Sequence, residues 1–420
     1  MFGFEAEGST SSLRLRTTVG ESITLPSWRR LLMEPTESQP LLERLKAAAD
    51  LSTADFALAR RDKHGRKVPQ AIAHRGYKAK YPENSMAAFV GAVEAGAQAI
   101  ETDVHLSKDG AVVLSHDPSL QRCFGKKEKV IDCNWDYLET LRTVAEPHVP
   151  LARLRDLLKY LTTEGLEDVW VLLDIKRDNK LDDVFRLIAA EIASVAPSPT
   201  GKPWSQRIVL GIWAANYLPH AAQHLPHYPQ TYISFSLPCA NKFLHSLPHI
   251  SFNLYAPILI GPLGARFRAQ ARRQRRPVFD WTVNKEVLMR WSVASGLDGV
   301  VTDEVEKFVA VRERWSGGLL LSEGRQQEEE EEEEGERERG GGGGGGGGSG
   351  VAAGAKKSKD VPPNEIWTWE GWCWAQLVDL AQLQVVLLLL TPVLWWWQRP
   401  WSALDQLGRV KAQERQRRIE

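Results

Sequence analysis

Three apolar stretches of the sequence end in side chains that can transfer protons or bind a metal ion. An imidazole can act as acid or base near neutral pH, carboxylates bind hard cations, and a guanidinium binds phosphate. The carboxyl ends of parallel strands meet on one face of an α/β sheet or barrel, where active sites form. We therefore expect these groups to share one pocket. They are His74 and Arg75 after residues 71–73, Glu101 and Asp103 after residues 98–100, and His116 and Asp117 after residues 112–115.

Two of these acids are expected to belong to a metal site. Glu101 and Asp103 lie two residues apart on a predicted strand, so their side chains point the same way. Two carboxylates on one face repel each other unless a proton or a hard cation lies between them. A third acid, Asp174, ends the apolar run at residues 169–175, and Lys176 lies on its side. Each acid alone would more often be a cap or an ion-pair partner, but together they predict one divalent cation, Mg²⁺ or Ca²⁺.

The residues between the first two strands predict an amphipathic helix. Asn84 or Ser85 can cap its start, and Gly96 can end it. The apolar residues 86, 89, 90 and 93 follow helical spacing. This strand, helix and strand should form a right-handed crossover.

The strand that precedes His116 is expected to join the sheet in another way. Residues 107–110 have the composition of a tight turn, and a parallel connection needs a longer crossover, so we expect an antiparallel hairpin. Leucines at 151, 154, 158 and 161 predict a buried helix face. The nine candidate strands predict an α/β fold, a (β/α)8 TIM barrel with one added hairpin strand. The six later candidates are residues 169–175, 207–213, 231–235, 252–257, 278–281 and 299–302.

The order and spacing of these residues resemble the glycerophosphodiester phosphodiesterase family. The resemblance covers about residues 69–312. It implies a TIM barrel of the phospholipase C-like phosphodiesterase type, a metal-dependent phosphodiester hydrolase, and supporting roles for Glu83 and Asn84. The motifs that carry it are His74-Arg75-Gly76, Glu83-Asn84-Ser85, Glu101-x-Asp103, His116-Asp117, Asp174-x-Lys176, Trp281-Thr282-Val283-Asn284 and Gly299-Val300-Val301-Thr302-Asp303.

Within that family the sequence is most similar to the fungal phosphatidylglycerol phospholipase C group. That group also has Asp-Ile-Lys at the third acid motif, here residues 174–176. Most of the family has glutamate at the position of Asp174. Because aspartate is one methylene shorter, the cation is expected closer to this strand or bridged to it by water.

The predicted site contains the groups that phosphodiester hydrolysis requires. Beside the three metal ligands, Arg75 and Lys176 would neutralise the phosphodiester and the charge that grows on its oxygens. His74 and His116 would act as general base and general acid, in either assignment. Trp281 would line the glycerol pocket or fill the barrel interior.

The predicted substrate is a glycerophosphodiester whose free glycerol hydroxyl attacks the neighbouring phosphate. If that glycerol is the head group of phosphatidylglycerol, the products are diacylglycerol and, after hydrolysis of the cyclic phosphate, glycerol 3-phosphate. Two alternatives remain open. One is a hydrolase of soluble glycerophosphodiesters such as glycerophosphocholine, and the other is a non-catalytic scaffold tethered to a membrane. The complete set of His, Glu and Asp residues argues against the scaffold.

Charge and cysteine content limit the partners and the setting of the chain. Basic and acidic residues are equal at 53 each, so no nucleic-acid partner is indicated. The four cysteines have neither zinc-site nor disulfide-framework spacing, which favours a reducing, intracellular setting.

We predict five regions: a partly disordered N-terminal extension, the barrel, a low-complexity disordered linker, a Trp-rich hydrophobic anchor and a basic tail. They cover residues 1–68, 69–314, 315–362, 363–402 and 403–420.

Tryptophans flank an apolar segment near the C-terminus. Four lie within residues 367–374 and four within residues 395–401, on either side of residues 375–394. As a helix this segment would span roughly 30 Å, the thickness of a hydrocarbon core, and tryptophans at both rims are typical of interfacial anchoring. Asp379 and Pro392 oppose full insertion, so a transmembrane helix, an interfacial anchor and a buried soluble helix remain alternatives. We expect an intracellular, membrane-associated protein with its barrel facing the cytosol, at the endoplasmic reticulum, a lipid droplet or the mitochondrial surface.

Two further groups of residues are not assigned to the site. Six arginines between residues 266 and 276 predict a solvated helix face or a patch that attracts anionic head groups. Five histidines have no acidic partner at ligand spacing and are predicted to be non-catalytic. They are His220, His224, His227, His245 and His249.

Overall fold

The computed structural model describes residues 14–16, 22–24, 54–62, 64–199 and 201–317. The chain divides into a unit of residues 1–50 and a unit of residues 51–420. In the first unit, β1 (Arg14–Arg16) pairs antiparallel with β2 (Ser22–Thr24). The predicted Trp-rich anchor and basic tail, and the linker from residue 318 on, lie outside the described residues. Among the helices that are described, none is both long enough and apolar enough to cross a bilayer.

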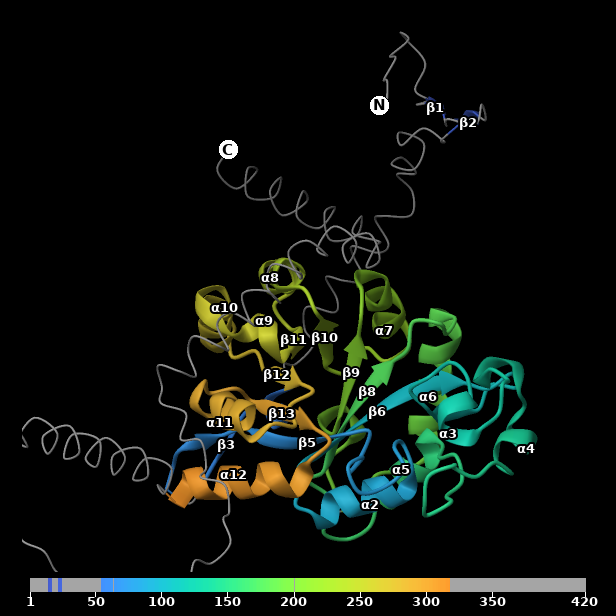
Figure 1. Ribbon diagram of the computed structural model, residues 1–420, viewed down its shortest axis with the longest axis horizontal. Helices are drawn as coiled ribbons and strands as arrows, with labels where there is room; N and C mark the ends of the chain where they lie inside the picture. The colour runs from blue at the N-terminus through green and yellow to red at the C-terminus, as the bar shows by residue number, and fades with distance from the viewer. Residues whose placement is uncertain (1–13, 17–21, 25–53, 63, 200, 318–420) are drawn as a thin grey trace, which may run out of the picture. The chain divides into compact units, whose positions relative to one another are not determined.

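Eight parallel strands close into a barrel in the second unit (Figure 1). Their order around the barrel is β5, β13, β12, β11, β10, β9, β8 and β6, and β6 pairs with β5 to close the ring. This confirms the predicted (β/α)8 barrel. The strands are β5 (Gln70–His74), β6 (Ala99–Leu106), β8 (Trp170–Ile175), β9 (Ile208–Ile212), β10 (Gln230–Ser234), β11 (Ser251–Tyr255), β12 (Val278–Trp281) and β13 (Gly299–Thr302).

Helices surround the barrel and connect its strands (Figure 1). Helix α2 (Met86–Glu94) starts where predicted, because the Ser85 hydroxyl accepts a hydrogen bond from the Ala88 N–H. The leucine stripe at 151, 154, 158 and 161 is buried, as predicted. The main helices are α2 (Met86–Glu94), α5 (Leu154–Tyr160), α6 (Leu181–Ser194), α7 (Leu218–His224), α8 (Leu237–Ser246), α9 (Ala256–Leu259), α10 (Gly261–Arg273), α11 (Glu286–Ala294) and α12 (Val305–Gly317).

An excursion between β6 and α5, residues 107–153, adds the ninth strand of the sheet. β7 (Val112–Leu114) runs antiparallel to β6, as the hairpin prediction requires. The excursion also contains the short helices α3 (Gln121–Phe124) and α4 (Trp135–Leu138). Its apolar side chains form a separate small core beside the barrel.

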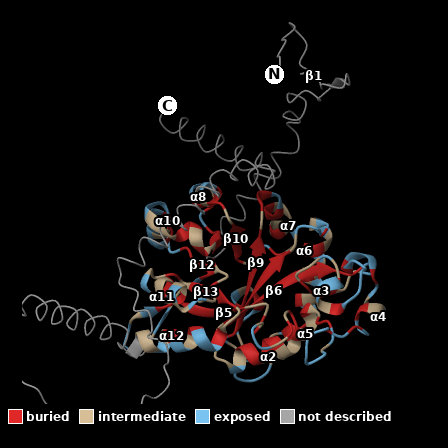
Figure 2. Cartoon of the chain, viewed as in Figure 1, coloured by how far each residue is buried: buried red, intermediate tan, exposed pale blue. Residues whose placement is uncertain are grey.

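The barrel strands are almost entirely buried (Figure 2). Apolar side chains fill the barrel interior at the end opposite to the carboxyl ends of the strands. Trp170 is fully buried there, and its indole N–H donates to the Gln70 side-chain oxygen at 2.9 Å. Phe56 packs edge-on against Trp170, with ring centroids 5.8 Å apart. Residues 54–58 therefore cover this end of the barrel, ahead of the boundary predicted at residue 69.

The arginine-rich run forms most of α10, and four of its arginines are exposed as predicted. The prediction of a solvated face is wrong for Arg276. Its side chain is 1% exposed, and it donates to the backbone oxygens of Leu244 and Ile250. This guanidinium satisfies carbonyl groups at the end of α8 and before β11, so its role is structural.

Asp280 is a buried acid in β12 that faces α11. Ser292 donates a hydrogen bond of 2.6 Å to its Oδ2 atom, and among the described residues its Oδ1 atom has no hydrogen-bond partner. Burial raises the pKa of Asp280 to about 7. The carboxyl group is therefore protonated in the folded protein at pH values where the unfolded chain is already ionised.

We predict that Asp280 makes the folded protein less stable as the pH rises from about 4 to about 7. Over this interval the folded state binds more protons than the unfolded state, so the free energy of unfolding falls. Asp280→Asn should reduce the loss between pH 5 and pH 8 by roughly 2–3 kcal/mol, measured by urea unfolding. The exposed Asp132→Asn is the control. Equal pH dependence in wild type and Asp280→Asn would contradict the prediction.

Candidate active site

A cavity of about 130 Å³ lies at the carboxyl ends of the barrel strands. All eight side chains predicted to bind metal, bind substrate or transfer protons line it. The two predicted supporting residues, Glu83 and Asn84, lie directly behind them and bond to them. The eight are His74, Arg75, Glu101, Asp103, His116, Asp174, Lys176 and Trp281.

Three buried carboxylates meet at the ends of β6 and β8. Glu101, Asp103 and Asp174 each offer an oxygen, and these oxygens lie within 4.8 Å of one another. The strand register explains the meeting, because Asp103 of β6 is the pairing partner of Asp174 of β8. Burial, together with the charges of the other two acids, raises the pKa of Glu101 well above its usual value.

Two cationic side chains offset this concentration of negative charge. Lys176 Nζ lies 2.6 Å from Asp103 Oδ1 and 2.6 Å from Asp174 Oδ2. Arg75 Nε lies 3.3 Å from Asp103 Oδ2, and the Arg75 backbone N–H donates to Glu101 Oε2 at 2.9 Å. Burial opposes ionisation of Asp103, but Lys176 and Arg75 outweigh it and lower its pKa. One member of the cluster therefore holds a proton readily while another is firmly ionised.

The three carboxylates fit a hard divalent cation. All donor atoms are oxygens, and an ion with ligand distances of about 2.3–2.6 Å can bridge oxygens this far apart. The shorter Asp174 side chain still reaches the cluster, where Trp213 Nε1 donates to its Oδ1 atom at 2.6 Å. A divalent cation would also relieve the repulsion that raises the pKa of Glu101.

Both predicted histidines are held by an aspartate through the same ring nitrogen. His74 Nδ1 lies 2.7 Å from Asp303 Oδ1, and His116 Nδ1 lies 2.8 Å from Asp117 Oδ1. Nε2 of each ring is therefore the nitrogen left to exchange a proton with a substrate. Burial opposes ionisation of Asp303, but His74 and Lys78 outweigh it and lower its pKa to about 2. Burial and the Lys176 cation lower the pKa of His116.

Two asparagines hold the acids of β6 and β13 in the same way. Asn84 Nδ2 donates to Asp103 Oδ2 at 2.8 Å, and its Oδ1 accepts from Thr102 Oγ1 at 2.7 Å. Asn284 Nδ2 donates to Asp303 Oδ2 at 2.7 Å, and its Oδ1 accepts from the hydroxyl of Thr302 at 3.1 Å. A Thr-Asp pair thus lies within β6 and another at the end of β13, and each aspartate is oriented by an asparagine from a neighbouring loop.

An ion-pair chain connects the two segments that carry the histidines. Glu83 accepts from Arg75 Nη1 at 2.9 Å and from both terminal nitrogens of Arg122 at 2.7 and 2.8 Å. Arg122 Nε then donates to Asp117 Oδ2 at 2.7 Å, and Asp117 holds His116. This gives the predicted supporting residue Glu83 a definite position in the site.

The mouth of the barrel is divided into a charged half and an aromatic half. Four neighbouring strands of the ring, β13, β5, β6 and β8, form the charged half. Asp303, which holds His74, follows β13, and His74 and Arg75 lie at the end of β5. The three carboxylates come from β6 and β8. The other four neighbours carry aromatic rings at their carboxyl ends. These are Trp213 after β9, Phe235 after β10, Tyr255 in β11 and Trp281 in β12.

Sequence reasoning missed the roles of several residues in this site. Asn284 and Asp303 belong to recognised motifs, but nothing in their spacing pairs Asp303 with His74, 229 positions away. Trp213 closes a predicted strand, so its strand-end position was an available signal. Arg122 lies in the excursion, where no pattern indicates its contact with Glu83.

The five histidines set aside from the sequence do not line the active-site cavity among its described residues. The prediction that they lack an acidic partner is wrong for two of them. His220 Nδ1 lies 3.4 Å and His224 Nε2 lies 2.8 Å from Asp182 Oδ1. The acid comes from α6, which packs beside α7, so sequence spacing could not reveal it.

The barrel and its site define a class of enzyme that hydrolyses phosphoric diesters. The chain belongs to the glycerophosphoryl diester phosphodiesterase family, whose model matches residues 74–307. It is accordingly a phosphoric diester hydrolase with glycerophosphodiester phosphodiesterase activity.

Curated relatives match part of the chain. The uncharacterized protein YqiK of Bacillus subtilis is 29% identical over 253 residues, 58% of this chain and 98% of that protein. A glycerophosphodiester phosphodiesterase of Caldanaerobacter subterraneus subsp. tengcongensis is 25% identical over 249 residues, 57% and 95% of the two chains. The lysophospholipase D GDPD1 of Rattus norvegicus is 38% identical over 97 residues, 23% of this chain and 30% of that protein.

Solved structures share the fold. One from Silicibacter pomeroyi has a TM-score of 0.54 at 21% identity and covers 63% of this chain and 99% of its own. An Oleispira antarctica phosphodiesterase, solved with the product sn-glycerol-3-phosphate, has a TM-score of 0.50 at 20% identity and covers 58% and 96% of the two chains.

We predict that Asp303→Asn lowers turnover of a glycerophosphodiester by roughly 100-fold. An amide in place of the carboxylate can present a donor to His74 Nδ1, which fixes the wrong tautomer and removes the charge that stabilises the imidazolium. Steady-state kinetics would measure the loss. Lys78→Met is the matched control, because Lys78 Nζ lies 3.6 Å from the same Asp303 oxygen but does not hold the ring. Wild-type turnover in Asp303→Asn, with an unchanged melting temperature, would contradict the role of this pair.

Proposed function

We propose that the chain cleaves phosphatidylglycerol to diacylglycerol and glycerol 3-phosphate, a reaction of the phospholipase C type. The observation that carries the proposal is one cavity lined by two imidazoles, three carboxylates, Arg75 and Lys176. The Asp-Ile-Lys sequence at residues 174–176, shared with the fungal phosphatidylglycerol phospholipase C group, supports the choice of lipid. The similarity to a lysophospholipase D supports a lipid substrate more generally.

The charged half of the barrel mouth would bind the phosphodiester. Arg75 and Lys176 would contact its non-bridging oxygens, because they are the cations that line the cavity. A divalent cation, Mg²⁺ or Ca²⁺, bound by Glu101, Asp103 and Asp174 would supply further charge neutralisation at the phosphate. The head-group glycerol would lie against the Trp281 ring, which is half-buried and faces the cavity.

The first step is attack by a glycerol hydroxyl on the neighbouring phosphorus. His116 is suited to the role of base, since its lowered pKa favours the neutral ring that can accept the hydroxyl proton at Nε2. His74 then protonates the departing diacylglycerol oxygen, and Asp303 stabilises its imidazolium form. One P–O bond forms and one breaks, which leaves a cyclic glycerol phosphate.

The second step returns both histidines to their starting states. His74, now neutral, accepts a proton from water as the water oxygen attacks the cyclic phosphate. His116, now protonated, donates to the glycerol oxygen that leaves phosphorus. The product is glycerol 3-phosphate, the compound bound by the Oleispira antarctica phosphodiesterase.

A second candidate function is hydrolysis of soluble glycerophosphodiesters such as glycerophosphocholine. The small volume and charged lining of the cavity favour it, because they suit a polar phosphodiester that has no acyl chains. The same two histidines would serve the same two steps. The two candidates differ only in the alcohol that leaves.

Incubation of the purified protein with phosphatidylglycerol vesicles should release glycerol 3-phosphate and diacylglycerol. EDTA should abolish the release, and Mg²⁺ or Ca²⁺ should restore it, because the carboxylate cluster loses its counter-charge without a cation. His116→Ala should lower turnover by roughly 100-fold or more, whereas the exposed His227→Ala should not. Release of phosphatidic acid in place of diacylglycerol would refute the phospholipase C assignment.

Membrane association through residues 363–402 is part of the proposal. An intracellular enzyme with this anchor would reach lipid head groups from the cytosolic face of the endoplasmic reticulum, a lipid droplet or a mitochondrion. The eight tryptophans around residues 375–394 support the anchor.

We predict that deletion of residues 362–420 lowers activity on phosphatidylglycerol vesicles and leaves activity on glycerophosphocholine unchanged. The barrel keeps its site, whereas the enzyme loses its concentration at the lipid surface. Vesicle co-sedimentation of both forms would measure the binding directly. If the shortened protein binds and cleaves vesicles as the full chain does, the anchor is refuted.

A further inference from the structure

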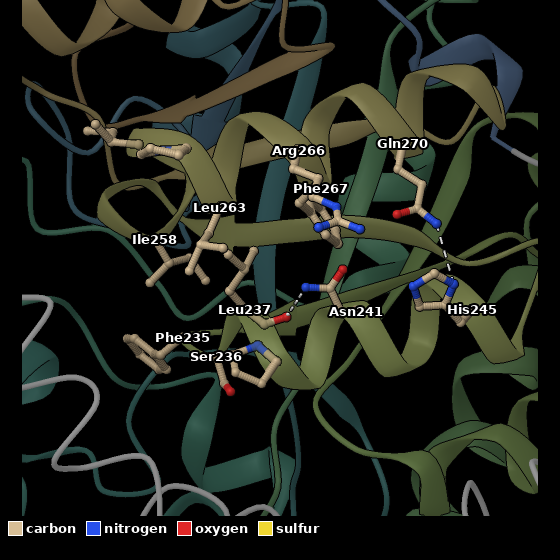
Figure 3. Close-up of a pocket in the computed structure, with 13 residues that line it drawn as sticks. Phe235, Ser236, Leu237, Asn241, His245, Ile258, Leu263, Arg266, Phe267 and Gln270 are labelled. Carbon is tan, nitrogen blue, oxygen red and sulfur yellow. Dashed lines mark hydrogen bonds between the residues drawn. The ribbon is translucent and has the colours of Figure 1, made fainter.

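A second cavity, of about 470 Å³, lies between α8 and α10 (Figure 3). We call it the α8–α10 groove. It begins at the carboxyl end of β10, where Phe235 and Ser236 lead into α8. It ends where the Gln270 side-chain amide lies 3.4 Å from His245 Nδ1. Along α8, from residue 237 to residue 245, this is a length of about 12 Å.

The α8–α10 groove adjoins the active site, because Phe235 lines both cavities. The Phe235 ring centroid lies 4.8 Å from that of Trp281 and 6.1 Å from that of Trp213. Trp213 in turn bonds to Asp174 of the carboxylate cluster. A substrate with its phosphate in the charged half of the mouth and its head-group glycerol against Trp281 would therefore extend its diacylglycerol part past Phe235 toward this groove.

The lining of the groove suits an uncharged, apolar ligand. Most of it comes from aliphatic, proline and phenylalanine side chains, and no carboxylate is among its described residues. Arg266 carries the only permanent charge there. Asn241 donates to the Leu237 backbone oxygen, so its amide is already engaged. Leu263, on the rim, is 73% exposed, more than any other large apolar side chain that the structure describes.

The two cavities differ in the part of a lipid that each can hold. The active-site cavity has about 130 Å³ and is lined on one half by charge, so it suits the phosphodiester and the glycerol. The groove is more than three times larger and mainly apolar, within the range of cavities that bind small molecules. We propose that the α8–α10 groove binds an acyl chain of the substrate. This inference rests on the proposed function, and it makes an acylated glycerophosphodiester the preferred substrate class.

Two water-soluble substrates with the same phosphoglycerol head group would test this inference. Dioctanoyl phosphatidylglycerol, kept below its critical micelle concentration, has acyl chains, and glycerophosphoglycerol has none. Leu263→Asp places a charge on the exposed rim, and Asn241→Trp fills the groove with an uncharged ring. Ala269→Asp is the matched control, since it adds the same charge to an exposed position of α10 that does not line the groove.

We expect both groove variants to raise the KM for the dioctanoyl substrate by about tenfold, because a charge or a bulky ring displaces the apolar chain. The kinetics of glycerophosphoglycerol cleavage should be unchanged in both, and Ala269→Asp should behave as wild type. Unchanged KM values in both variants would overturn the inference while leaving the proposed function intact. Failure of the wild-type protein to cleave either substrate would overturn the proposed function itself. An effect seen with vesicles but not with the monomeric lipid would assign the groove to membrane contact and overturn the acyl-chain assignment.

Discussion

The active site depends on keeping three carboxylates together against their mutual repulsion. Glu101, Asp103 and Asp174 are buried within one small volume, where charge is poorly solvated and the repulsion is strong. The pairing of β6 with β8 fixes their backbones, and Lys176 bridges two of the acids. Arg75 neutralises part of the remaining charge and is itself held by Glu83. Both histidines line the cavity that contains this balanced cluster.

The same hydrogen-bonding arrangement orients two aspartates, one within β6 and one directly after β13. Asn84 adopts a left-handed backbone conformation with φ of 54°, which asparagine tolerates better than most residues. This turns its amide toward Thr102 and Asp103. Asn284 makes the matching contacts with the Thr-Asp end of β13. Asn84 fixes a carboxylate of the buried acidic cluster, and Asn284 fixes the aspartate that holds His74, so both groups of acids depend on asparagine amides.

Sequence reasoning predicted the elements of the barrel and the composition of its charged half. Acids that follow apolar residues, such as Glu101, and the motif around His74 are local signals, and the apolar runs set the strand limits closely. Contacts between distant segments could not be predicted, because pairings such as Asp303 with His74 arise only when the ring closes. The prediction for Arg276 was wrong for a related reason. Its charge and neighbours suggested an exposed face, whereas the fold buries it against carbonyl groups that no local pattern reveals.

His116 is delivered by the excursion that follows β6, outside the eight-stranded ring. The excursion has its own apolar core, pairs with β6 through β7, and contacts Glu83 through Arg122. Because β7 pairs with the edge of β6 that extends beyond the ring, a change in the length of the excursion would leave the closed ring of eight strands intact. Exchange of this one insert offers a route to reposition His116, the proposed base of the first step, on an otherwise constant scaffold.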